Sequence, residues 1–157
     1  MSFKQATVAA AATVAVAAIV WQFAFGASDA DAAALRLPYD EAARVSQGAE
    51  LYAENCAVCH GAALQGAPNW RERDADGLMP APPHDASGHT WHHPDEVLFR
   101  ITKLGTEAVV GQGYQSNMPG FADSMTDQDI LDVLAFIKST WPERVIEMHN
   151  SMNAQSE

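Results

Sequence analysis

Two cysteines and a histidine lie within five consecutive residues of this 157-residue chain, and they constrain its fold more than any other feature. Cys56, Cys59 and His60 form a C-x-x-C-H unit, which is typical of c-type haem attachment. Thiols at this spacing form thioethers with the two vinyl groups of a haem, and the following imidazole binds the iron as its proximal ligand. Side chains three and four residues apart are neighbours on a helix, so one turn presents all three groups together. The motif predicts one covalently bound haem c.

The same thiols allow a second interpretation, a redox-active dithiol. Cys56 and Cys59 are the only cysteines of the chain, so a disulfide could form only between them. A thioredoxin-type C-x-x-C requires a βαβ context. The hydrophobic spacing around this motif is helical instead, and His60 follows directly. Both observations favour haem attachment.

The charge balance limits the class of partner. The chain has 20 acidic residues against 9 lysines and arginines, with a formal net charge of −11. Nucleic acid is disfavoured as a partner because its phosphates bind basic surfaces. A positively charged redox protein is compatible with this charge. An acidic surface that only keeps the domain soluble explains it equally well, and neither the electron donor nor the acceptor is indicated.

Residues 5–25 carry no charged side chain, and this length is about what a helix needs to span a bilayer. Lys4 precedes the stretch, and aromatic residues gather at its far end, as at a membrane interface. We expect residues 1–25 to be an uncleaved anchor that tethers the chain on the periplasmic side of a bacterial inner membrane. The alternative is a signal segment, cleaved near Ala30, that releases a soluble periplasmic protein.

The remaining chain divides into three segments. Residues 26–38 are rich in alanine and end at a proline, as expected for a linker. Residues 39–141 alternate helical periodicity with Gly- and Pro-rich loops and show no strand pattern, which predicts an all-α domain. Residues 142–157 form a C-terminal tail, where a short polar helix with frayed ends is expected. The three main helices are expected over residues 40–58, 94–104 and 127–140.

Specific residues mark two of the expected helix starts. Pro94 suits the first position of a helix, where its missing N–H is harmless. Thr126 and Asp129 resemble a capping box, with Asp in place of the usual Glu or Gln. Residues 61–93 and 106–125 lack a sustained period and are expected to be loops. A loop of this length is unusual in a compact domain, but a haem would give it a large apolar surface to pack against.

A haem iron bound by His60 requires a second axial ligand or an open site. Met118 is the best candidate because a thioether binds haem iron and the following Pro119 and Gly120 fix a turn. Met79 also precedes a proline and is a weaker candidate. Any single methionine could instead fill a gap in the core. Ligation by His and Met would raise the reduction potential.

These motifs occur in an order that resembles a class I c-type cytochrome of the bacterial monohaem kind, periplasmic or membrane-tethered. The similarity spans roughly residues 40–141. The matching features are Gly48, Leu51, Tyr52, the C-x-x-C-H unit with Gly61, residues 117–121 and residues 132–138. The resemblance implies a cytochrome c fold, with three main helices and long loops around one haem, after an N-terminal transmembrane or signal helix. It also implies electron transfer, without catalysis, in a respiratory or photosynthetic chain.

The resemblance assigns further residues by their place in the family pattern. The first and last main helices are expected to cross at Gly48 and Phe136. A loop carbonyl after the motif is expected to accept a hydrogen bond from the proximal histidine, and Pro68 matches that place. The anionic haem propionates usually bind N–H or O–H donors. The candidates, which could equally be core or solvated side chains, are Trp70, Arg71, Arg73, Trp91 and Tyr114.

Residues 80–93 are not part of the family's minimal pattern, and they contain four of the six histidines. Neutral imidazole is the commonest metal ligand, so a copper or zinc site is one interpretation. A histidine as the sixth iron ligand is a second. The third is a loop whose histidines form hydrogen bonds to backbone or propionate groups.

Two other functions remain open. The chain could be the haem-binding subunit of a larger oxidoreductase complex. It could also be an enzyme or sensor in which a small molecule displaces Met118. The sequence shows no Ser, His or Asp constellation with catalytic spacing, so an electron carrier is favoured.

Overall fold

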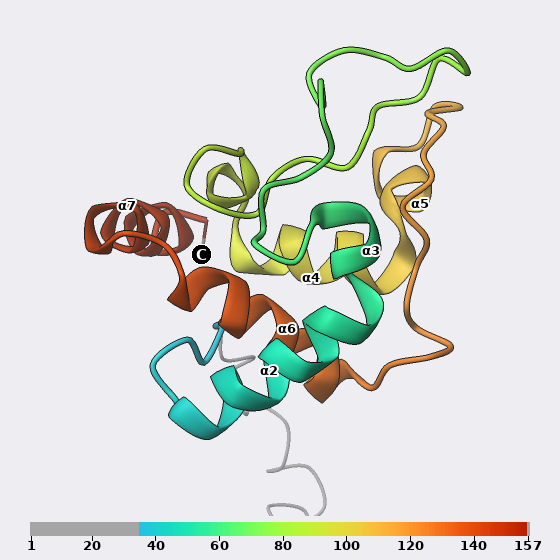
Figure 1. Cartoon of the computed structure of the whole chain (residues 1–157). Coiled ribbons are helices and arrows are strands. Elements are labelled where there is room, and N and C mark those ends of the chain that lie inside the picture. The colour runs from blue at the N-terminus through green and yellow to red at the C-terminus, as the bar shows by residue number, and fades with distance from the viewer. Residues whose placement is uncertain (1–34, 157) are drawn as a thin grey trace, which may run out of the picture. The chain divides into compact units, whose positions relative to one another are not determined.

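Helices and loops alone make up residues 35–156, the part of the chain that this computed structural model describes, and the absence of strands there confirms an all-α domain. The predicted anchor over residues 5–25 and most of the linker lie outside the described residues. Between residues 35 and 156, no helix is long and apolar enough to cross a membrane. The elements are α2 (Ala42–Asn55), α3 (Ala57–His60), η1 (Thr90–His92), α4 (Asp95–Leu104), α5 (Thr106–Val110), α6 (Asp127–Ser139) and α7 (Glu143–Asn153) (Figure 1).

Helices α2 and α6 cross at a buried glycine (Figure 1). A Cβ atom on Gly48 would lie 1.9 Å from the carbonyl oxygen of Asp132 and 3.0 Å from the Cβ of Phe136. No other side chain fits this contact, so the glycine permits the close approach of the two helices. The predicted crossing at Gly48 and Phe136 is confirmed. An ion pair between Arg44 and Asp132 joins the same two helices.

Helix α6 has the start and the buried face that its sequence predicts. The Asp129 N–H donates to Thr126 Oγ1 at 3.2 Å, and the Thr126 N–H donates to the Asp129 carboxylate at 2.9 Å. This reciprocal pair is a capping box. The apolar residues spaced three and four apart in this region are all buried, as an amphipathic helix requires: Ile130, Leu134, Ile137 and Trp141.

Three details of the predicted helices need correction. The first helix is interrupted at Cys56, where α2 ends and α3 begins. Pro94 is the N-cap of α4, with an extended ψ of 155°, and the first helical residue is Asp95. Residues 106–110 form the short helix α5 instead of loop. Gly105 between α4 and α5 has a φ of +86°, which lets the chain turn sharply and begin a new helix at once.

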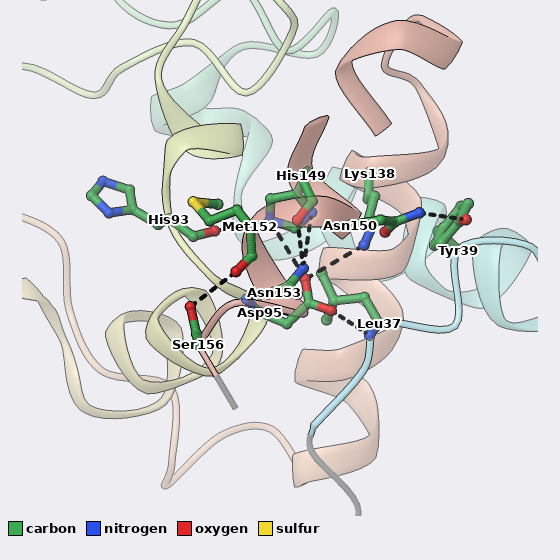
Figure 2. A network of polar contacts seen from close by, with 10 residues as sticks. All are labelled: Leu37, Tyr39, His93, Asp95, Lys138, His149, Asn150, Met152, Asn153 and Ser156. Atoms are coloured by element: carbon green, nitrogen blue, oxygen red, sulfur yellow. Dashed lines mark hydrogen bonds and ion pairs between the residues drawn. The ribbon is translucent and has the colours of Figure 1, made fainter. Parts of the chain in front are cut away.

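Helix α7 is joined to the domain by a buried polar network (Figure 2). The Asp95 carboxylate accepts the Leu37 N–H at 3.0 Å, and its other oxygen lies 3.5 Å from His149 Nε2 and 3.6 Å from Lys138 Nζ. His149 Nε2–H donates to the His93 carbonyl at 2.9 Å. Burial lowers the pKa of both His149 and Lys138. The network joins α4, α6 and α7, since Asp95, Lys138 and His149 lie on these three helices. Removing one of the charged partners would leave an uncompensated buried charge, which strongly destabilises a fold.

Candidate functional site

The C-x-x-C-H unit occupies a single helical turn directly after α2. The carbonyl oxygen of Cys56 accepts the N–H groups of Cys59 at 3.1 Å and His60 at 2.9 Å, which closes the turn. Both thiols are free, with Cys56 buried and Cys59 exposed. Burial, with the neighbouring Cys59 as a smaller cause, raises the pKa of the Cys56 thiol to about 11. The turn therefore brings the three predicted attachment residues together.

His60 is buried and held in one tautomer. Its Nδ1 lies 2.8 Å from the carbonyl oxygen of Pro82. A carbonyl oxygen only accepts, so Nδ1 carries the proton and Nε2 keeps the lone pair that binds a metal. Burial lowers the pKa of His60, although the bond to Pro82 opposes this shift. A neutral ring with Nε2 available is the state that a proximal haem ligand requires.

Pro68 does not supply this carbonyl, contrary to the expectation from the family pattern. Pro68 is exposed, and the acceptor of the His60 Nδ1–H is Pro82. The chain instead returns to the motif later, where the His84 N–H donates to the Leu64 carbonyl at 2.8 Å. That bond holds the adjacent Pro82 against His60. The family's minimal pattern lacks residues 80–93, where the accepting carbonyl lies. The pattern therefore assigned the role to Pro68, which comes earlier in the chain.

The loop that contains Met118 is bonded to the end of α4. The N–H groups of Phe121 and Ala122 donate to the carbonyl oxygens of Thr102 and Lys103, both at 3.0 Å. These carbonyls belong to the last turn of the helix, which has no further helical N–H partners. The loop is therefore seated directly on α4.

A glycine lets the Met118 turn approach α4 closely. A Cβ atom on Gly120 would lie 2.6 Å from the carbonyl carbon of Leu104. The turn, α4 and α5 border a hollow of about 620 Å³ that is open to solvent and lined by Met118 with Leu104 and Glu107 among others. Met118 is half-buried at its wall. Backbone contacts with α4 therefore fix the loop from which the Met118 side chain extends.

Residues 45–141 match the family model described as cytochrome c. The chain belongs to the cytochrome c family. No curated protein and no solved structure matches it. Membership establishes a covalently bound haem c and haem-based electron transfer, and the turn that presents Cys56, Cys59 and the neutral His60 fits that cofactor.

This cytochrome c has a second imidazole against the ring of His60. The rings of His84 and His60 are stacked, with centroids 4.0 Å apart and an angle of 24° between their planes. His84 Nδ1–H donates to Thr90 Oγ1 at 2.9 Å. Burial first, and the nearby His60 second, lower the pKa of His84 well below 6.5. Nothing in the sequence distinguishes His84 from the other histidines of residues 80–93.

The histidines of residues 80–93 do not form the copper or zinc site that was one interpretation of the sequence. Within residues 35–156, no three His, Cys, Asp or Glu side chains are grouped so as to hold a metal ion. The rings lie against aromatic partners instead. His89 stacks on Trp70 with centroids 5.4 Å apart, and His92 stacks on Trp91 at 3.7 Å. His89 also lies edge-on to His93, with centroids 5.6 Å apart.

Among the predicted propionate donors, Trp91 stands out. Its Nε1–H is buried and has no acceptor among residues 35–156. A buried N–H normally has a hydrogen-bond acceptor. The carboxylate of a haem propionate would be a suitable acceptor for this N–H. The Arg71 guanidinium lies 4.2 Å from the centroid of the Trp70 ring and is exposed. Tyr114 is half-buried, and its role, like that of Arg71, stays a prediction.

Proposed function

We propose that this cytochrome c is a single-electron carrier with one haem c, bound through Cys56 and Cys59 and ligated by His60 and Met118. The observation that carries the proposal is the Nδ1–H bond from His60 to the Pro82 carbonyl at 2.8 Å. This bond leaves the Nε2 of His60 unprotonated and free to bind iron, in the residue that directly follows Cys59. When bound, the haem supplies one-electron oxidation and reduction of its iron. The chain contributes the orientation of the ligands and the exclusion of water.

The structure around Met118 supports its role as the second ligand. Hydrogen bonds from Phe121 and Ala122 to α4 fix the loop beyond the methionine. The Met118 N–H donates to Ser116 Oγ at 3.1 Å, which fixes the loop before it. A methionine whose backbone is fixed on both sides needs little rearrangement when an electron arrives or leaves. Met79 remains a weaker alternative, half-buried in the loop between the motif and η1.

The setting of this carrier is proposed from the sequence. The net charge of −11 is compatible with positively charged redox proteins as donor and acceptor, and we propose a bacterial respiratory or photosynthetic chain as their setting. We place the domain on the periplasmic side of the inner membrane, tethered by residues 1–25 or released after cleavage. The intact mass of the purified protein distinguishes the two, because the cleaved form lacks that segment.

Replacing Met118 with alanine is expected to abolish the weak near-infrared band that a methionine–iron bond gives in a ferric c-type haem. The thioether is the only part of the residue that can bind iron, so the loss should be complete. The measurement is the near-infrared spectrum of the oxidised protein. Met79→Ala is the matched control and should keep the band at full intensity.

Two outcomes would refute the Met118 assignment. The first is a band that survives in Met118→Ala while disappearing in Met79→Ala. The second is a wild-type protein that carries covalent haem but shows no band, which would favour a site open to small molecules. In both cases the haem attachment itself would stand.

A further inference from the structure

We infer that His84 is a positioning residue for the proximal ligand, and that its imidazole fixes the rotation of the His60 ring. The inference rests on the proposed role of His60 as an iron ligand. It assigns a purpose to the loop over residues 80–93, which the family pattern does not contain.

Two contacts from neighbouring residues restrain His60 in different directions. The Pro82 carbonyl accepts the Nδ1–H at 2.8 Å and so restrains the edge of the ring. The His84 ring covers one face, with centroids 4.0 Å apart and planes 24° from parallel. A hydrogen bond at one edge tolerates some tilt about its own axis. A flat side chain against the face opposes that tilt, so the two contacts together define the plane of His60.

His84 is itself held firmly enough to act as a support. Its N–H donates to the Leu64 carbonyl at 2.8 Å, and its own carbonyl accepts the Trp141 Nε1–H at 2.8 Å. Its ring Nδ1–H donates to the buried Thr90 Oγ1, whose hydroxyl donates to the Pro83 carbonyl at 3.3 Å. These bonds tie residue 84 to the turn after the haem motif and to the residues after α6.

Close backbone packing supports the same segment. Pro83, between the two residues that contact His60, is fully buried. A Cβ atom on Gly66 would lie 2.5 Å from the Pro83 nitrogen, and one on Gly88 would lie 2.0 Å from the Pro83 carbonyl oxygen. Side chains at these two positions would displace the segment. The loop is therefore built so that residues 82–84 lie tightly against His60.

The orientation of an axial imidazole changes the NMR spectrum of the haem, whereas a change in protein stability alone does not. In low-spin ferric haem, the orientations of the axial ligands, the plane of the imidazole among them, determine the distribution of the unpaired electron over the haem. That distribution sets the spread of the paramagnetically shifted haem-methyl signals in the proton NMR spectrum. A residue that acts through ligand orientation should change this pattern, whereas a residue that only stabilises the fold should not.

The experiment compares three variants of the oxidised holoprotein. His84→Leu removes the flat ring and is expected to rearrange the haem-methyl shifts or to split them into two sets. His84→Phe keeps a flat ring against His60 and is expected to retain the wild-type pattern. His93→Leu removes another half-buried imidazole of the same loop, whose ring lies edge-on to His89, and serves as the matched control, with unchanged shifts. Covalent haem content should be equal in all three.

An unchanged shift pattern in His84→Leu would overturn the inference, as would equal rearrangement in His93→Leu. If His84→Leu does not fold, Thr90→Val tests the same contact, because it removes the acceptor of the ring N–H at nearly constant volume. A smaller rearrangement is then expected, and an unchanged pattern would contradict the inference. A wild-type protein without covalent haem would instead refute the proposed function, and the inference with it.

Discussion

Gly48→Ala is expected to reduce the free energy of unfolding of the cytochrome by about 3 kcal/mol or more, in the upper range for overpacked sites. The added Cβ would lie 1.9 Å from the Asp132 carbonyl oxygen, which is backbone and cannot rotate away. Helices α2 and α6 would have to separate at their crossing. Denaturation by urea, followed by circular dichroism in the helical region, measures the loss.

The control for this substitution is an exchange of alanine and glycine that changes helix propensity alone. In an exposed helix interior, alanine is favoured over glycine by about 1 kcal/mol. Ala53→Gly, on the exposed face of α2, should therefore lose about that amount. Propensity alone would make Gly48→Ala more stable than wild type. A variant as stable as wild type would show that the two helices do not meet at Gly48 as described.

Replacing both Cys56 and Cys59 with serine is expected to remove covalent haem completely. A serine hydroxyl does not form the thioether, so any haem left in the site would be held only by ligands and packing. Acid–acetone extraction should then release all of it, whereas the wild-type haem should stay with the protein. The intact mass of the denatured chain, with and without the haem mass, measures the difference.

The single variants serve as controls for the double variant. Cys56→Ser and Cys59→Ser should each retain one thioether and so keep haem through extraction. Covalent haem in the double variant would contradict attachment at this motif. Loss of haem from wild type on extraction would contradict it equally.

Features whose signals lie close together in the sequence could be predicted. The C-x-x-C-H unit, the capping box of Thr126 and Asp129 and the apolar face of α6 each depend on residues within a few positions of one another. The crossing at Gly48 and Phe136 was predicted from the family pattern. Glycine is unfavourable within a helix, so its presence at position 48 is itself an indication of close helix packing.

Features that depend on how a loop closes could not be predicted. The contact of Pro82 and His84 with His60 exists because residue 84 returns to Leu64, and no local pattern encodes that bond. Four histidines in one loop are compatible with a metal site, with a sixth iron ligand or with hydrogen bonds to nearby groups, and only their surroundings in the fold distinguish these roles. The stacked pair therefore emerged only from the fold.

The attachment of α7 was missed for a related reason. Asp95, Lys138 and His149 come from three different helices, and each alone is typical of a solvated surface position. Only their meeting in the core makes the last helix part of the domain (Figure 2). The polar composition of residues 143–153 pointed to a helix with frayed ends instead.

A redox titration of the purified protein, followed by its visible absorption, tests most directly the claim that His60 and Met118 ligate one electron-carrying haem. Met/His ligation raises the reduction potential of a c-type haem. We predict a single reversible one-electron transition at a positive potential. A strongly negative potential, or a titration that requires two transitions, would contradict a single haem with these two ligands.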